Sequence, residues 1–191
     1  METPKHPKSE LPYIYTDEEL KRIFEYAGSD SLHTTSLYPG TLKYVLHMTY
    51  VMGLRISETL SLRVSNVNMK ESYIEIIDSK RHKSRLVPFN RQVYRLITKR
   101  MRWRVLPGMA NDPDTPFWLN KRGIQLTAST IKKHYAKIRI TLDIRRTDGE
   151  RMKPRIHDLR HTIAVRRLTQ WYQEGVECTG SAAHTIDLSW T

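Results

Sequence analysis

Apolar residues recur at helical spacing along most of the chain. The clearest start is the capping box Thr16-Asp17-Glu18-Glu19, after which apolar positions repeat until Gly28 supplies a stop. The same period predicts further helices over residues 41–52, 90–105, 129–142 and 158–174, with a short helix over 57–62. These segments favour a mainly helical protein.

Two short segments carry the β-branched and aromatic residues typical of strands. They are Tyr73–Ile77 and Arg85–Phe89, and the polar segment 78–84 between them predicts a hairpin with a cationic tip. Residues 117–119 predict a brief additional strand. The fold class expected is therefore α+β, mainly helical, with one small antiparallel sheet.

The length of 191 residues favours one globular domain. We expect a linker or disordered leader over residues 1–15, a folded domain over 16–175, and a divergent, weakly ordered tail over 176–191, where the apolar period is lost. No apolar run approaches the roughly 20 residues that a membrane helix needs, and the first residues lack a signal-peptide core. A cytoplasmic protein without a membrane partner is expected.

The charge balance narrows the class of partner. Lysine and arginine number 32 against 20 acidic residues, a net charge of +12, so a polyanion is the expected partner. Charge alone does not separate DNA from RNA, from an anionic membrane, or from a merely soluble basic protein. Cys178 is the single cysteine, which excludes an internal disulfide and fits a reducing compartment.

Two motifs place candidate chemistry at predicted helix starts. In Gly53-Leu54-Arg55-Ile56-Ser57-Glu58 an arginine follows a helix-ending glycine, with an acid three residues later. An ordinary surface pair of Arg55 with Glu58 is the simplest reading of this motif alone. In His157-Asp158-Leu159-Arg160-His161-Thr162 the spacing puts His157 and Arg160 on one face at a helix N-terminus, a surface suited to a phosphate.

Two further patterns carry alternatives. Lys80 and Lys83 lie in the hairpin loop, where a lysine near other cations can donate a proton to a leaving oxygen, although such loops are usually only solvated. His157 and His161 have the i,i+4 spacing of a zinc-protease helix, but no glutamate follows His157 as in HExxH. No metal site is therefore expected.

Together these motifs resemble one family, the tyrosine recombinases and phage integrases. GLRISE followed by LSL resembles the family's first arginine box, SKRHKSRLVPF its lysine hairpin, and HDLRHT its second box, H-x-x-R-H. The three boxes stand in the family's order. The resemblance extends from about residue 11 to residue 175 and implies the DNA breaking-rejoining catalytic-domain fold, mobile-element DNA recombination and integration as the activity, and duplex DNA as the partner.

The resemblance also implies roles for individual residues. Arg55 and Arg160 would bind the non-bridging oxygens of the scissile phosphate, and Glu58 would orient Arg55. His157 would assist proton transfer with support from His161. Lys80, or less favourably Lys83, would protonate the leaving 5′ oxygen. No cofactor is required.

The family pattern is not followed after the second box, where a Gly-His pair and a nucleophilic tyrosine are expected. His184 is a low-ranking candidate for the histidine, and the nucleophile is not identified. Tyr172 lies about 18 Å along the same helix from Arg160 and is expected to be a core or groove residue. A truncated or frameshifted gene product is one hypothesis for this tail.

Three functions stay open at this point. The first is a strand-exchange catalytic domain that binds duplex DNA but, with no nucleophilic tyrosine identified, is expected to be inactive in forming the covalent intermediate. The second is a non-catalytic DNA-binding or regulatory fragment that competes with a full-length recombinase, and the third is a type IB topoisomerase-like relaxase. The resemblance implies a tetramer on DNA, whereas the DNA target is not encoded in any readable pattern.

Overall fold

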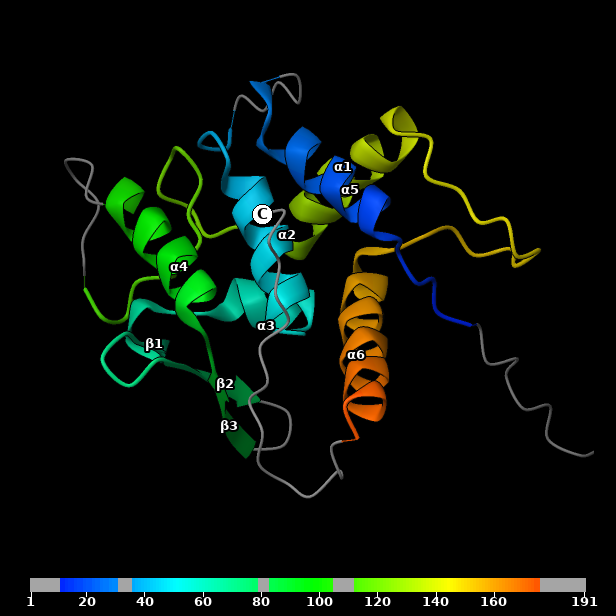
Figure 1. The fold of residues 1–191 in the computed structure, drawn as a ribbon. Coiled ribbons are helices and arrows are strands. Elements are labelled where there is room, and N and C mark those ends of the chain that lie inside the picture. Colours follow the sequence, from blue (N-terminus) through cyan, green and yellow to red (C-terminus); the bar gives the residue numbers. More distant parts are fainter. Residues whose placement is uncertain (1–10, 31–35, 79–82, 105–111, 176–191) are drawn as a thin grey trace, which may run out of the picture.

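The computed structural model describes residues 11–30, 36–78, 83–104 and 112–175 (Figure 1). The helices and strands occur in the following order: α1 (Asp17–Gly28), α2 (Thr41–Val51), α3 (Ile56–Ser61), the 3₁₀ turn η2 (Val64–Asn66), β1 (Val67–Asn68), β2 (Tyr73–Asp78), β3 (Lys83–Pro88), α4 (Arg91–Arg104), α5 (Ala128–Thr141) and α6 (Ile156–Gln173). The predicted fold class, mainly helical with one small antiparallel sheet, is confirmed.

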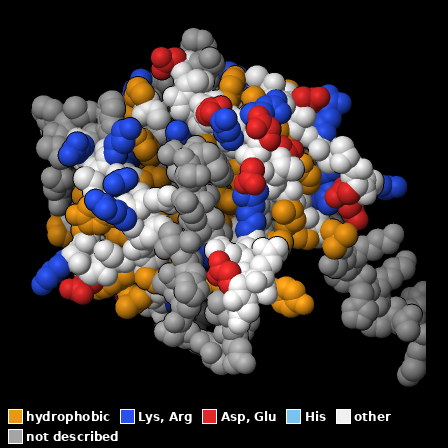
Figure 2. All heavy atoms as spheres, in the orientation of Figure 1, with side chains coloured by type: hydrophobic (Ala, Val, Ile, Leu, Met, Phe, Trp, Pro, Cys, Tyr) orange, Lys and Arg blue, Asp and Glu red, His pale blue; other side chains and the backbone are white. Residues whose placement is uncertain are grey.

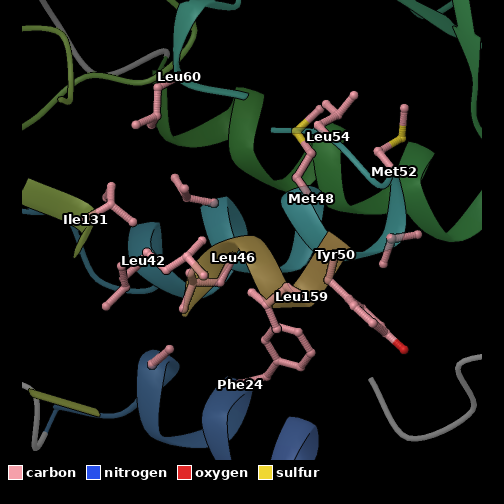
Figure 3. Packing of buried hydrophobic residues seen from close by; sticks show 14 of the residues in the cluster. Phe24, Leu42, Leu46, Met48, Tyr50, Met52, Leu54, Leu60, Ile131 and Leu159 are labelled. Atoms are coloured by element: carbon pink, nitrogen blue, oxygen red, sulfur yellow. The ribbon is translucent and has the colours of Figure 1, made fainter. Parts of the chain in front are cut away.

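Helix α2 is the centre of the core. It contacts α1, α3, α4 and α6, and most of its residues are buried, including Leu42, Leu46, Met48 and Tyr50 (Figure 3). A helix that is buried nearly all round needs apolar residues on every face, which explains why α2 has a weaker amphipathic pattern than α1. This burial fixes the C-terminal end of α2, from which the first arginine motif continues.

The strand pairing puts Arg85 on the same face of the sheet as a buried isoleucine. Its strand order is β1-β2-β3, and both pairs are antiparallel. Ile76 on β2 is buried and stands opposite Arg85 on β3. Directly opposed residues of an antiparallel pair share one face, so Arg85 lies on the face that Ile76 turns to the core. Leu86 points to the other face and is 61% exposed.

The chain is anchored one residue before the expected start of structure. Thr16 and Glu19 form the predicted capping box of α1. Tyr15, which was expected to belong to the leader, is instead buried: its backbone N–H donates to Thr162 Oγ1 and its hydroxyl donates to the Arg155 carbonyl. A large aromatic side chain with both polar groups satisfied belongs in a core, so a leader reaching residue 15 is too long.

Residues 117–119 do not form the strand that the sequence predicts. Phe117 and Trp118 are fully buried, but only the isolated bridges Arg63–Pro116 and Leu119–Gln125 connect this segment to its neighbours. Its apolar run reflects burial in the core rather than pairing in a sheet. A short apolar run alone cannot distinguish these two cases.

Candidate functional site: three arginines around Glu58

The first arginine is held by a tight helix end. Gly53 has φ +60°, its N–H donates to the Tyr50 carbonyl, and the N–H of Leu54 donates to the Thr49 carbonyl. These two bonds form a Schellman motif. The residue just after the helix cap, here Gly53, must then adopt a left-handed conformation, which favours glycine. Leu54 is buried, and Arg55 follows as the residue that caps α3.

Glu58 gathers three arginines that come from three different elements. Its Oε2 accepts from the Arg55 backbone N–H at 2.8 Å, and its Oε1 accepts from Arg55 Nη1 at 2.9 Å. Arg85 Nη2 on β3 donates to Oε2 at 2.8 Å. Arg160 Nη1 on α6 lies 3.6 Å from the same oxygen, an ion pair. The two arginines of the separate sequence motifs therefore share one carboxylate.

Electrostatics keep Glu58 ionised. Partial burial raises the pKa of its carboxyl, but hydrogen bonds from Arg85 and Arg55 outweigh burial and hold the pKa below its ordinary value. Burial lowers the pKa of Arg160, and the attraction of Glu58 opposes that effect. Three guanidinium groups around one carboxylate leave the cluster with an excess of two positive charges.

The arginines keep donors for an additional anion. The side chains are 55% exposed for Arg55, 41% for Arg85 and 32% for Arg160, whereas that of Glu58 is only 12% exposed. Glu58 is therefore covered by the arginines, and the three guanidinium-bearing side chains are the part of the cluster that is exposed to solvent. An arginine fork that is fixed on one side and open on the other is suited to binding a phosphate oxygen.

The two histidines of the second motif stand beside this cluster on α6. The rings of His157 and His161 are 4.7 Å apart and nearly perpendicular. Burial, followed by the nearby charges of His161 and Arg160, lowers the pKa of His157. Asp158 between them is buried and accepts from the Arg155 N–H, so it caps the helix and does not face the cluster.

Three other candidates cannot be placed. Lys80 and His184 lie outside the described residues. Lys83 is the first residue of β3, but the structure describes only its backbone and not its side chain. Tyr172 was expected to be a core or groove residue; it is 89% exposed near the end of α6, so the core position is wrong.

Arg85 is the member of the cluster that the motifs did not identify as functional. The sequence places it in a strand, but its direction depends on the register of β3 with β2, which is set by the pairing of Arg85 with Ile76. The available signal was the alternation of Arg85 and Val87 on one face against Leu86 on the other.

Within the described ranges, no three histidine, cysteine or acidic side chains converge as metal ligands. In the same ranges, none of the helices has the length and apolarity to cross a bilayer.

Comparison with known proteins supports the motifs. The model of the phage integrase family matches residues 14–177. The chain is 27% identical over 173 residues to the putative integrase/recombinase y4rB of Sinorhizobium fredii, covering 89% of this chain and 54% of the relative. It is 30% identical over 174 residues to tyrosine recombinase XerD of Haemophilus influenzae, covering 86% and 52%. The chain therefore spans about half the length of these relatives.

A solved structure has the same fold. The XerH site-specific recombinase in a pre-cleavage complex with its difH substrate aligns with a TM-score of 0.64 at 22% identity, covering 85% of this chain and 44% of that one. This likeness confirms the expected recombinase catalytic-domain fold. Together with the family match over most of its length, it shows that the chain belongs to the phage integrase family of tyrosine recombinases.

Proposed function

We propose that this chain is the catalytic domain of a site-specific tyrosine recombinase, which breaks and rejoins duplex DNA at a phosphodiester in the cytoplasm. The observation that carries the proposal is the convergence of Arg55 and Arg160 on Glu58 with their outer donors exposed. The similarity to the putative integrase/recombinase y4rB, to tyrosine recombinase XerD and to the XerH recombinase bound to its difH substrate supports the same substrate class.

Charge matching explains how the cluster would act. A phosphodiester carries one negative charge, and the five-coordinate transition state concentrates more charge on its non-bridging oxygens. Arg55 and Arg160 would bind those oxygens, and the two excess positive charges of the cluster would stabilise the transition state more than the ground state. Glu58 would hold both guanidinium groups in place before DNA arrives, so less conformational entropy is lost on binding.

The histidines and the hairpin lysine would move protons. His157, with its pKa lowered, is neutral at neutral pH and has a ring nitrogen that accepts a proton from an attacking hydroxyl. His161 would support it. Lys80, or alternatively Lys83, would protonate the leaving 5′ oxygen, and His184 ranks lower as an additional histidine. The proposal involves no metal or cofactor, and the nucleophilic tyrosine is left unassigned.

The domain limits and assembly belong to the same proposal. The folded catalytic domain would occupy residues 15–175, one residue longer at its start than the sequence predicts, with a leader before it and the divergent tail over 176–191 after it. On DNA the chain would act as part of a homotetramer or beside a full-length recombinase.

A nicked suicide duplex tests the catalytic proposal. Nicking releases the short strand after cleavage, so an attacking side chain remains covalently attached to DNA and shifts on a denaturing gel. An adduct that is lost in Arg160→Gln but not in Arg151→Gln, an exposed arginine outside the cluster, would support catalysis by this site. An adduct that survives in Arg160→Gln would contradict it.

A non-catalytic DNA-binding subunit is the second candidate. It is favoured by the position of Tyr172, which is exposed about 18 Å along α6 from Arg160 and is not brought to the arginines. This candidate keeps the phosphate grip without cleavage. It predicts salt-dependent duplex binding that Arg160→Gln weakens, and no adduct on the nicked duplex.

A further inference from the structure

Helix α4 has an unusual composition. Its sequence RQVYRLITKRMRWR contains six basic residues and no acidic residue. Arg91, Arg95, Lys99 and Arg102 are all exposed. Their spacing puts them on one side of the helix, and together they are named here the α4 basic face.

The core does not require this face. Val93 and Ile97 are buried on the opposite side of α4, and the buried Arg100 lies over the ring of Trp118 at 5.5 Å. These contacts attach the helix to the domain. The packing of α4 against the domain therefore does not depend on the four exposed cations of the α4 basic face.

The charges on this face repel one another. Arg91, Arg95 and Lys99 follow at i,i+4 intervals, and each like-charge pair of this kind destabilises a helix by about 0.2–0.5 kcal/mol. None of the ion pairs formed between described residues involves the α4 basic face. A polyanionic partner would remove this repulsion.

A groove beside the face adds cations from a second element. It has a volume of about 770 Å³ and lies between α1, α2 and α4. Arg95 and Lys99 line it from α4, Lys43 lines it from α2, and Glu25 is its one acidic lining residue. Burial, with a smaller contribution from Lys43, lowers the pKa of His47 in this groove to about 4, so the positive potential comes from the lysines and arginines.

The face is separate from the arginine cluster. Figure 1 shows α4 and α6 on either side of α2, and both helices contact α2. Figure 2 shows lysine and arginine side chains gathered over the part of the surface where α4 lies. The cluster residues Arg55, Glu58, Arg85 and Arg160 come from α3 and its cap, β3 and α6, and none of them lies on α4 or lines the groove, so a molecule bound along α4 would not occupy the cluster.

We propose that the α4 basic face is a second binding surface for duplex DNA, which contacts the phosphate backbone of DNA other than the segment held at the arginine cluster. The proposal rests on duplex DNA being the substrate. From Arg91 to Arg102 the helix rises about 16 Å, the length of roughly five base pairs.

Salt dependence measures these contacts directly. The variant Arg91→Gln/Arg95→Gln/Lys99→Gln/Arg102→Gln removes the face. A matched control, Lys21→Gln/Lys70→Gln/Lys121→Gln/Arg122→Gln, removes the same charge from exposed positions on other elements. Duplex affinity would be followed by fluorescence anisotropy at several salt concentrations.

We expect the slope of log K against log [salt] to become shallower by about 3 to 4 in the α4 variant, since each lost phosphate contact contributes about 0.9. The control should lose less than about 1 by the same rule. The unfolding midpoint of the α4 variant should stay equal or rise, because repulsion is removed. Equal slopes for the two variants would overturn the proposal, and so would equal competition by polyglutamate and by duplex DNA for the face.

The variant Arg55→Gln/Arg160→Gln in the same assay separates this proposal from the proposed function. Weaker binding in that variant, with the α4 variant matching its control, would overturn the second surface alone. Weaker binding in the α4 variant, with no change on loss of Arg55 and Arg160, would support the second surface and contradict the arginine site.

Discussion

Replacing Glu58 by glutamine tests the network that holds the site together. The substitution keeps the shape of the side chain but removes the negative charge, and it turns an NH₂ donor toward guanidinium donors of Arg55 or Arg85. A hydrogen bond to a charged group contributes about 1.5–3 kcal/mol when well shielded. Because both arginine side chains are about half exposed, screening reduces this contribution, and we expect Glu58→Gln to lose about 1–2 kcal/mol of unfolding free energy.

The pH dependence identifies the ionised carboxylate as the cause. The folded pKa of Glu58 lies below its ordinary value of about 4.5, so its ionic stabilisation is fully present above that value and is lost as pH falls through the folded pKa. The difference between wild type and Glu58→Gln should be constant from about pH 5.5 to 7.5 and shrink below about pH 4.5.

Urea unfolding followed by circular dichroism measures this difference, with Glu71→Gln in the exposed turn between β1 and β2 as the control. The control should change stability by less than about 0.5 kcal/mol. A Glu58→Gln variant as stable as wild type at pH 7, or one whose deficit persists unchanged at pH 3.5, would refute the reasoning.

Three further outcomes are expected, one in the cluster around Glu58, one at the buried His47 and one at the start of α1. Arg85→Ala should raise the pKa of Glu58, seen as a shifted carboxyl titration by NMR, and Arg85→Lys should restore part of the shift; an unchanged titration in Arg85→Ala would contradict the pairing. His47 is neutral when folded down to about pH 4, so stability should fall by up to about 3 kcal/mol between pH 6.5 and pH 4, and His47→Gln should lose this slope in urea titrations. Thr16→Ala should cost about 1 kcal/mol by removing the α1 cap, whereas Thr98→Ala, at a half-buried position inside α4 with no capping role, should change the urea midpoint less.

The sequence predicts well those features that depend on local chemistry. The capping box at Thr16, the helix end at Gly53 and the strands around the hairpin are set by side-chain and backbone rules that act over a few residues. For the same reason Arg55 and Arg160 were recognisable, since each sits in a compact motif at a helix start.

Features that depend on pairing between distant segments were not predictable in this way. Arg85 reaches Glu58 because β3 pairs with β2 in one register, and a shift by one residue would turn it to the other face. Phe117 and Trp118 looked like a strand because burial in a core selects the same residue types as a sheet. Tyr172 was expected to be a core or groove residue, but whether it is buried depends on long-range packing, and it is 89% exposed.

The most direct test of the central claim is whether Arg55 and Arg160 bind the same phosphodiester. The Nε–H signals of the two arginines, assigned through Arg55→Lys and Arg160→Lys, would be followed by NMR while a short duplex DNA is added. Two arginines that hold one phosphate should shift together along one saturation curve. If duplex DNA binds while one or both signals remain unchanged, the two arginines do not form a common phosphate site.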